Sequence, residues 1–183
     1  APGTFVVIDQ FIDRTRARSR SFFETGVVAH VSMAHPTCSR LADTAYAAAQ
    51  HLDLNTVRGG TYVAMEGPQF SSLAESKLYK SWGADVIGMT NLPEAYLARE
   101  AEICYASVGM VTDYDCWHPD HDAVQVADIV RVLLENADNA RSLVKQVTPS
   151  VSKFDRPCPA GCHRVLDDAI ITGPDARDPK VVR

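Results

Sequence analysis

Two aspartates one residue apart, Asp113 and Asp115, are the residues with the clearest chemical potential in this sequence. They end an apolar run that begins at residue 103, as a buried strand would. Residues two apart in a strand face the same side, so both carboxylates are expected to face one pocket. One can then be held protonated as a proton donor while the other stays ionised and accepts hydrogen bonds. The alternative is that one caps the next helix and the other is solvated.

Two further segments place polar or flat side chains where predicted strands end. Phe70 follows the turn Gly67-Pro68 and opens a helix. Its ring could stack on a flat ligand, or it could simply pack in the core. Thr90 follows a buried strand, which is a common position for a phosphate contact and also for an ordinary helix cap.

Potential metal ligands occur in two groups. His118, His121 and Asp122 lie close together, but a proline separates the histidines and no second cluster completes a site. Cys158 and Cys162 could form a strained disulfide or half of a zinc site. No partner pair is evident elsewhere in the sequence, so we expect inert thiols or a local disulfide, and no metal.

The elements that must position these residues alternate between strand and helix. This alternation predicts an α/β fold with a mixed, largely parallel central sheet flanked by helices. Ligands then bind at the carboxyl ends of the strands. The expected strands are 4–13, 26–33, 59–68, 84–89 and 103–115, and the expected helices are 39–52, 71–83, 92–102 and 122–147.

Helix ends and faces can be predicted from local patterns. Ser39 is expected to cap the first helix, and Ser72 with Glu75 fits a capping box. Apolar residues at helical spacing predict the buried stripe of the last helix. That stripe is Val126, Ile129, Val130, Leu133, Ala137, Ala140 and Val144.

Composition and charge exclude several classes of protein. With 183 residues, 46% of them hydrophobic, the chain can bury one sizeable core. The net charge of −5 argues against a nucleic-acid surface, and the arginine-rich stretch 13–20 is expected to be a solvated loop. No apolar stretch approaches the roughly 20 residues that span a bilayer. Five cysteines without a signal peptide favour a reducing cytoplasm.

Several segments together resemble the trimeric purine nucleoside phosphorylase family, and within it the members that cleave S-methyl-5'-thioadenosine. They are "IDQFIDRT", "AHVSMAHP", "EGPQFSSLAES", "WGADVIGMTNLPEAYLAREAEICYASVGMVTDYDCW" and the helix that follows. The resemblance implies a purine nucleoside phosphorylase-like domain over 1–149 that lacks its N-terminal part. The proline-rich tail 150–183 lies outside the match and is expected to pack on that domain, with a short helix near 164–170.

The resemblance implies a pentosyltransferase of purine and methionine salvage. Its reaction would be phosphorolysis of S-methyl-5'-thioadenosine to adenine and 5-methylthioribose 1-phosphate, with inorganic phosphate as co-substrate and no cofactor. It also implies a cytoplasmic homotrimer or dimer of trimers, or a separate polypeptide that supplies the N-terminal part. The alternatives are a 6-oxopurine nucleoside or methylthioinosine phosphorylase, and a non-catalytic binding or assembly subunit.

The resemblance also implies a role for each candidate residue. Asp113 would protonate N7 of the purine, and Asp115 would accept a hydrogen bond from the 6-amino group. A 6-oxopurine would present an acceptor to Asp115, a mismatch that costs about 1–3 kcal/mol. The remaining contacts would be Phe70 and Ser71 to the base, Met89 to the ribose, Thr90 to phosphate, Val126, Ile129 and Val130 to the 5'-methylthio group, and His30 from a neighbouring subunit.

Overall fold

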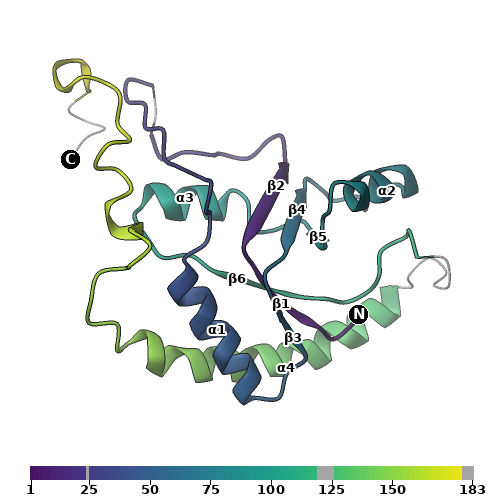
Figure 1. Ribbon diagram of the computed structural model, residues 1–183. Coiled ribbons are helices and arrows are strands. Elements are labelled where there is room, and N and C mark those ends of the chain that lie inside the picture. The colour runs from purple at the N-terminus through teal and green to yellow at the C-terminus, as the bar shows by residue number, and fades with distance from the viewer. Residues whose placement is uncertain (24, 119–125, 179–183) are drawn as a thin grey trace.

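The computed structural model describes residues 1–23, 25–118 and 126–178 as a mixed α/β fold, which confirms the predicted class (Figure 1). The strands are β1 (Phe5–Ile8), β2 (Gln10–Arg14), β3 (Thr56–Arg58), β4 (Thr61–Met65), β5 (Val86–Gly88) and β6 (Ser107–Met110). The helices are α1 (Ser39–His51), α2 (Leu73–Ser81), α3 (Glu94–Glu100) and α4 (Val126–Val151), followed by the 3₁₀ turns η1 (Cys162–Arg164) and η2 (Pro174–Ala176).

The strands form two three-stranded sheets. In the first, β1 lies between β3, which is parallel to it, and β6, which is antiparallel. In the second, β4 lies between β2 and β5, and all three strands are parallel. The single strand expected over 4–13 is therefore wrong, because β1 and β2 belong to different sheets.

The chain passes between the sheets at two adjacent points, Asp9 and the pair Gly59-Gly60. Both glycines have positive φ, 90° and 150°, a region that side chains disfavour. The Gly60 N–H donates to Asp9 Oδ1 at 3.0 Å, and the Asp9 N–H donates to the Gly60 carbonyl at 3.2 Å. The two sheets diverge from the point where Asp9 and Gly60 are hydrogen-bonded, and the cavity described below lies between them.

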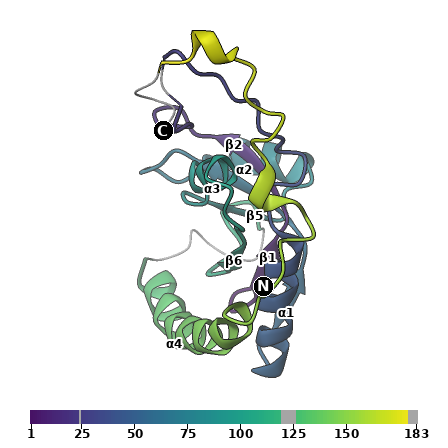
Figure 2. The ribbon, with the colours of Figure 1, turned by 90° about the vertical axis from the view of Figure 1, so that its left-hand side faces the viewer.

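The core lies around β1 and α1. Phe5, Val7 and Ile8 are each no more than 1% exposed, as expected for an uninterrupted apolar strand covered on both faces. Phe5 packs with Ala48 and Ala49 of α1 and with Leu143 of α4. Figures 1 and 2 show α1 and α4 side by side along this end of the molecule.

Of the two predicted helix starts, one is confirmed and one is wrong. The Ser72–Glu75 capping box is confirmed, with Ser72 N–H donating to the Glu75 carboxylate at 2.8 Å. The N-cap of α1 is Cys38, not Ser39. The strand over 26–33 is wrong: Ala29 forms only an isolated bridge with Ile170 of the tail. This segment runs along the tail instead of entering a sheet, so no ladder of strand partners forms.

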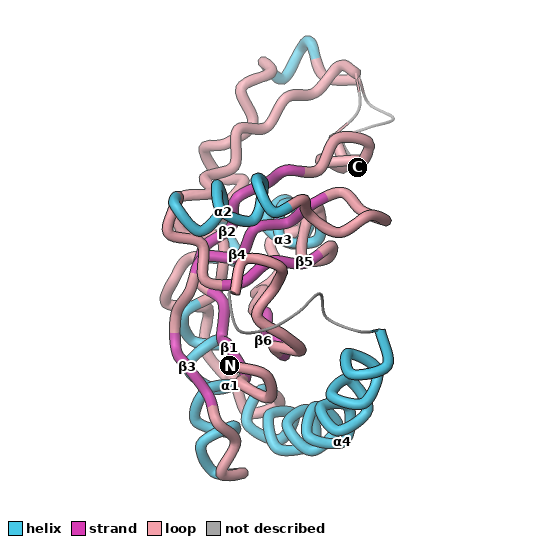
Figure 3. Tube along the Cα trace, turned by 90° about the vertical axis from the view of Figure 1, so that its right-hand side faces the viewer, coloured by secondary structure: helices cyan, strands magenta, loops and turns pink. Residues whose placement is uncertain are grey.

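The buried face of α4 differs from the predicted stripe. Val130, Leu133 and Val144 are 46%, 49% and 64% exposed, whereas Asn136 and Leu143 are 3% and 6% exposed. Asn136 can occupy the inner face because its side-chain amide donates to the Val111 carbonyl at 3.5 Å. The predicted burial is therefore wrong for Val130, Leu133 and Val144, whereas Ala137 and Ala140 are half-buried. Figure 3 shows α4 beneath β1 and β6.

The C-terminal tail returns past α1 and α3, on the side of the molecule where it is drawn in yellow-green and yellow in Figure 1. Leu166 N–H donates to the Glu102 carboxylate at 3.0 Å, and Ile171 N–H donates to the Val28 carbonyl at 3.0 Å. The short helix expected over 164–170 is replaced by η1 and consecutive turns. Among the described residues, no helix combines the length and apolar character needed to cross a membrane.

Candidate active site

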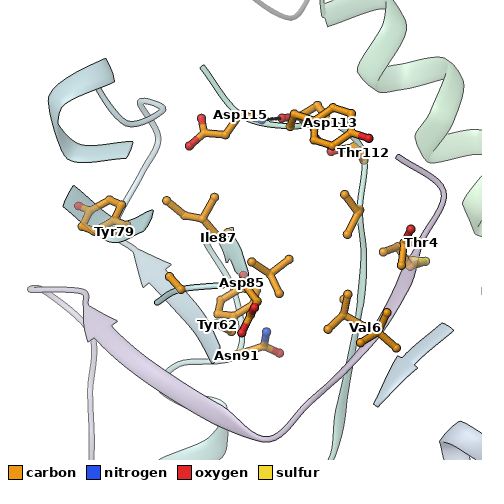
Figure 4. Close-up of a pocket in the computed structure, with 18 of the residues that line it drawn as sticks. Thr4, Val6, Tyr62, Tyr79, Asp85, Ile87, Asn91, Thr112, Asp113 and Asp115 are labelled. Atoms are coloured by element: carbon orange, nitrogen blue, oxygen red, sulfur yellow. Dashed lines mark hydrogen bonds between the residues drawn. The ribbon is translucent and has the colours of Figure 1, made fainter. Parts of the chain in front are cut away.

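A cavity of about 790 Å³ opens between the two sheets (Figure 4). Residues of β1 and β6 line one side, and residues of β4, β5 and α2 line the other. Figure 4 shows Asp113 and Asp115 together at one end, with Tyr62 and Asn91 toward the other. Four predicted site residues from two segments meet here: Met89, Thr90, Asp113 and Asp115.

The aspartates reach the cavity by a different route from the predicted strand alternation. Strand β6 ends at Met110, so both aspartates lie in the loop after it. Asp115 has a φ of 59° in the left-handed region. Asp113 stabilises this loop because Oδ1 accepts from the Asp115 N–H at 2.8 Å and Oδ2 accepts from the Thr112 hydroxyl at 2.7 Å. Both aspartates therefore line one pocket, as predicted. The loop after β6 brings them there, so the prediction that strand alternation does this is wrong.

Helix α2 fixes the second aspartate. The Ser76 hydroxyl donates to Asp115 Oδ2 at 2.5 Å, and the Cys116 N–H donates to Oδ1 at 2.8 Å. Ser76 is only 2% exposed, so water does not easily replace this bond. An ionised carboxylate has about four acceptor positions, so both aspartates retain capacity for a ligand. Ser76 was not recognised in the sequence, where a mid-helix serine carries no distinctive signal.

Tyr62 of β4 orients Thr90. The Tyr62 hydroxyl lies 3.2 Å from Thr90 Oγ1 and accepts from the Thr90 N–H at 3.2 Å. Gly88 makes room for this arrangement, because a Cβ there would overlap the Tyr62 hydroxyl. A buried tyrosine usually finds a hydrogen-bond partner, but the sequence does not say which one. Tyr62 was therefore missed.

Asn91 links the β5–α3 connection to β6. It is 9% exposed and has a φ of 71°, a conformation that asparagine tolerates better than most residues. Its Oδ1 accepts from the Tyr105 hydroxyl at 3.0 Å and from the Ser107 hydroxyl at 2.7 Å. These bonds hold the floor of the cavity, and sequence reasoning did not find them.

The arginine-rich loop braces the turns beside the cavity. Arg18 donates to the carbonyls of Leu92 and Glu66, the latter at 3.1 Å, and its Nε lies 3.7 Å from the Glu66 carboxylate. Arg20 lies 3.0 Å from the Asp13 carboxylate. The prediction of a solvated loop is therefore wrong for Arg18, whose side chain is 20% exposed and bonds to turn carbonyls. It agrees with Arg20, whose side chain is 51% exposed.

Lys80 and Trp117 add a cationic and an aromatic group to the lining. The Lys80 ammonium lies 3.2 Å from the centroid of the Trp117 ring. Such a cation–π contact holds the loop after Asp115 against α2. His118 stacks on Tyr114 in the same loop, with ring centroids 4.7 Å apart, while His121 and Asp122 lie outside the described residues.

The remaining predicted contacts do not line the cavity. Phe70 is 71% exposed, so the alternative that it packs in the core is wrong, and its stacking on a ligand stays a prediction. Ser71 lies beside the aspartate loop, with its carbonyl 3.7 Å from Cys116 Sγ. His30 is exposed, and its N–H donates to the Ala169 carbonyl of the tail at 2.8 Å.

The predicted apolar slot is only partly described. The side chains of Val126 and Ile129 lie outside the described residues. Val130 is exposed and does not line the cavity, whereas Leu133, one turn further along α4, does. Hydrophobic spacing did not distinguish these two residues.

The prediction that Cys158 and Cys162 lack a partner pair is wrong. Cys38 and Cys104 lie against them, and the four sulfur atoms are within 4.8 Å of one another. Burial raises the pKa of Cys162 to about 11, helped by the neighbouring thiols. Burial also raises the pKa of Cys158, but hydrogen bonds from the N–H groups of Cys162 and Ala160 and from Cys38 outweigh it and lower that pKa to about 6.

Comparison with known proteins assigns the chain to a family. The family model described as the phosphorylase superfamily matches residues 1–149. The chain belongs to the phosphorylase superfamily. It is 60% identical over 182 residues to the S-methyl-5'-thioadenosine phosphorylase of Bradyrhizobium diazoefficiens, and the match covers 100% of this chain and 62% of that protein. The S-methyl-5'-thioadenosine phosphorylase of Rhodospirillum rubrum is 62% identical over 182 residues, with the same two coverages.

Solved structures of this superfamily share the fold. A methylthioadenosine phosphorylase from an Antarctic soil metagenomic library has a TM-score of 0.88 and 43% identity, covering 98% of this chain and 63% of that one. The Schistosoma mansoni methylthioadenosine phosphorylase, solved with adenine, has a TM-score of 0.86 and 28% identity over 93% of this chain and 67% of its own. The chain thus spans about 62% of the length of the two curated relatives.

Proposed function

We propose that the whole protein cleaves S-methyl-5'-thioadenosine by phosphorolysis, giving adenine and 5-methylthioribose 1-phosphate. The observation that carries this proposal is the pair of anchored carboxylates, Asp113 and Asp115, at one end of the cavity. The relatives that span the whole of this chain bear the name of that activity.

The aspartate pair complements a 6-aminopurine. Adenine presents an N–H donor at N6 and an acceptor at N7, so it needs one acceptor and one donor from the protein. An ionised Asp115, held by Ser76, accepts from the amino group. A protonated Asp113 donates to N7. A 6-oxopurine would leave Asp115 opposite another acceptor, and an unsatisfied buried pair of this kind costs about 1–3 kcal/mol.

In the reaction, a phosphate oxygen attacks C1' as the bond from C1' to N9 of the purine breaks. The bonding electrons pass into the purine, and the Asp113 proton moves to N7, so that neutral adenine leaves. General acid catalysis of this kind commonly contributes 10²–10⁴-fold to the rate. The Asp113 carboxylate left behind regains a proton from water. Thr90, oriented by Tyr62, contributes a hydroxyl to the phosphate.

The 5'-methylthio group would lie against α4. Val126, Ile129 and Val130 fall on one face of that helix, and Leu133 extends the face into the cavity. A buried thioether gains roughly 0.8 kcal/mol per CH₂-sized group, whereas a 5'-hydroxyl would lose its water. Met89, which lines the cavity, would lie against the ribose.

A neighbouring subunit would complete the site in a trimer or a dimer of trimers. His30 would reach the 5' slot of the adjoining subunit, and its exposure in this chain leaves the side chain accessible to a neighbour. Phe70, which is 71% exposed, and Ser71 would then lie beside the base.

The test is product analysis with the whole protein. S-Methyl-5'-thioadenosine is incubated with and without phosphate, and adenine and the sugar phosphate are measured by chromatography and mass spectrometry. Phosphate-dependent release of equal amounts of the two products is expected. Faster cleavage of methylthioinosine would instead assign a 6-oxopurine enzyme, and binding of adenine without any cleavage would assign a non-catalytic subunit. Sedimentation of the same sample measures the oligomeric state.

A further inference from the structure

Four cysteines from distant parts of the chain converge away from the cavity. Cys38 caps α1, Cys104 precedes β6, and Cys158 and Cys162 belong to the tail. Their sulfur atoms lie within 4.8 Å of one another, and those of Cys38 and Cys158 are 3.5 Å apart. Three of the four, Cys38, Cys158 and Cys162, are no more than 5% exposed.

This geometry fits a tetrahedral metal ion. Zinc binds thiolates at about 2.3 Å, so the four sulfurs of a tetrahedral site lie about 3.8 Å apart. A disulfide instead requires a sulfur–sulfur distance near 2.05 Å. The three residues between Cys158 and Cys162 also agree with the usual spacing of paired zinc ligands, about two to four residues. The approach of all four sulfurs to one point distinguishes this cluster from a simple thiol pair.

The turn between the tail cysteines is shaped to present both thiols together. Gly161 has a φ of 70°, a conformation that glycine adopts without steric cost, and its N–H donates to the Cys158 carbonyl at 2.9 Å. The chain then enters η1 at Cys162.

A positive charge lies beside the cluster. Arg99 Nη1 is 3.6 Å from Cys162 Sγ. The Arg99 Nε is buried and has no hydrogen-bond partner among the described residues. Four thiolates around a divalent ion carry a net charge of about −2, which an adjacent guanidinium partly neutralises. Arg99 is half-buried, and its Nη2 also donates to the His35 carbonyl.

We propose that Cys38, Cys104, Cys158 and Cys162 bind one Zn²⁺ ion as four thiolates. Each thiol that is protonated beforehand releases its proton when the ion binds. Four soft sulfur ligands in a closed tetrahedral arrangement select zinc over magnesium or calcium and leave no open position for catalysis. The ion therefore has a structural role: it fastens the tail to the N-terminus of α1 and to the segment before β6.

The first test is the metal content of the whole protein, purified without chelators or a histidine tag. Mass spectrometry of the metals is expected to find about one zinc per chain. Cys158→Ser should reduce the zinc content per chain at least tenfold. Cys116→Ser, at the exposed fifth cysteine, should leave it unchanged. Circular dichroism verifies that both variants fold.

The second test needs no variant. Zinc is removed with a chelator under reducing conditions, and the protein is titrated with Co²⁺. An intense thiolate-to-cobalt charge-transfer band with tetrahedral d–d bands, saturating at one equivalent, is expected. Digestion of the tail by a protease should speed up in the metal-free form and slow again after zinc is restored. Protein that contains no zinc and shows no cobalt spectrum would overturn the proposal, as would disulfides among these four cysteines in freshly purified protein.

Discussion

Replacing Ser76 by alanine tests whether the anchoring of Asp115 matters for recognition of the base. The substitution removes the hydroxyl that donates to Asp115 Oδ2 at 2.5 Å and leaves the Cys116 N–H bond in place. Asp115 would then be held by one partner and could rotate away from the position that meets the amino group.

The size of the effect follows from the charge and the burial of this bond. A hydrogen bond to a charged group contributes about 1.5–3 kcal/mol, and Ser76 is only 2% exposed. Each 1.36 kcal/mol corresponds to a factor of ten in rate. We therefore expect kcat/KM for S-methyl-5'-thioadenosine to fall by at least about tenfold. Discrimination against methylthioinosine should also fall, because a mobile Asp115 opposes an oxopurine less strongly.

The assay is initial-rate phosphorolysis with both nucleosides at saturating phosphate, together with urea unfolding. Ser81→Ala is the matched control, since Ser81 lies on the same helix and bonds only to the Leu78 carbonyl in the described structure. If Ser76→Ala keeps wild-type kcat/KM and base preference, or if Ser81→Ala matches its losses, the reasoning about Asp115 is refuted.

Three other substitutions give separate expectations. Asp113→Ala should lower kcat by about 10²–10⁴-fold, as for loss of a general acid, while the free energy of unfolding falls by only about 1–2 kcal/mol. Gly88→Ala should destabilise the fold by about 1–3 kcal/mol in urea unfolding, because the new methyl group meets the Tyr62 hydroxyl. Asp13→Asn should destabilise the protein at neutral pH and lose that effect in acid. Burial raises the pKa of Asp13, but hydrogen bonds from Thr15 and the charge of Arg20 outweigh it and lower the pKa below 3.8. The stabilisation by ionised Asp13 is therefore fully present above pH 3.8. It disappears as the pH falls through the lower pKa of Asp13 in the folded protein.

Each of these has its own control. Asp113→Ala with wild-type turnover would remove the general acid from the mechanism. Gly173→Ala should be nearly neutral, since a Cβ there meets nothing within 4 Å, and equal losses in both glycine variants would contradict the steric argument. For Asp13→Asn, a destabilisation that persists unchanged below pH 3 would show that the ion pair and hydrogen bonds are not its cause.

Some parts of the fold that depend on neighbours in the sequence were predictable. The capping box of Ser72 and Glu75 spans three residues, and the apolar run of β1 predicted its burial on both faces. The division of β1 and β2 between two sheets was not predictable. It depends on Asp9 meeting Gly60, about fifty residues away in sequence, and no local pattern records that contact.

The candidate site shows the same limit. The sequence identified Asp113, Asp115, Met89 and Thr90, which all line the cavity. Their supporting groups were missed, because hydrogen bonds such as Ser76 to Asp115 join segments that only the folded chain brings together.

The same holds for the cysteines and for α4. Cys38 and Cys158 are 120 residues apart in the sequence, so the convergence of the four sulfurs had no signature in the spacing of any one segment. An analysis of apolar spacing assigns Asn136 of α4 to the surface. The residue is nevertheless buried, because its side chain bonds to a backbone carbonyl.

The most direct measurement is a crystal structure of the whole protein with adenine and phosphate bound. Adenine N6 should lie within hydrogen-bond distance of the Asp115 carboxylate and N7 within that distance of Asp113, with phosphate near the Thr90 hydroxyl. Adenine bound outside the cavity between the two sheets, or both carboxylates turned away from its N6 and N7, would contradict the proposed recognition and the chemistry that depends on it.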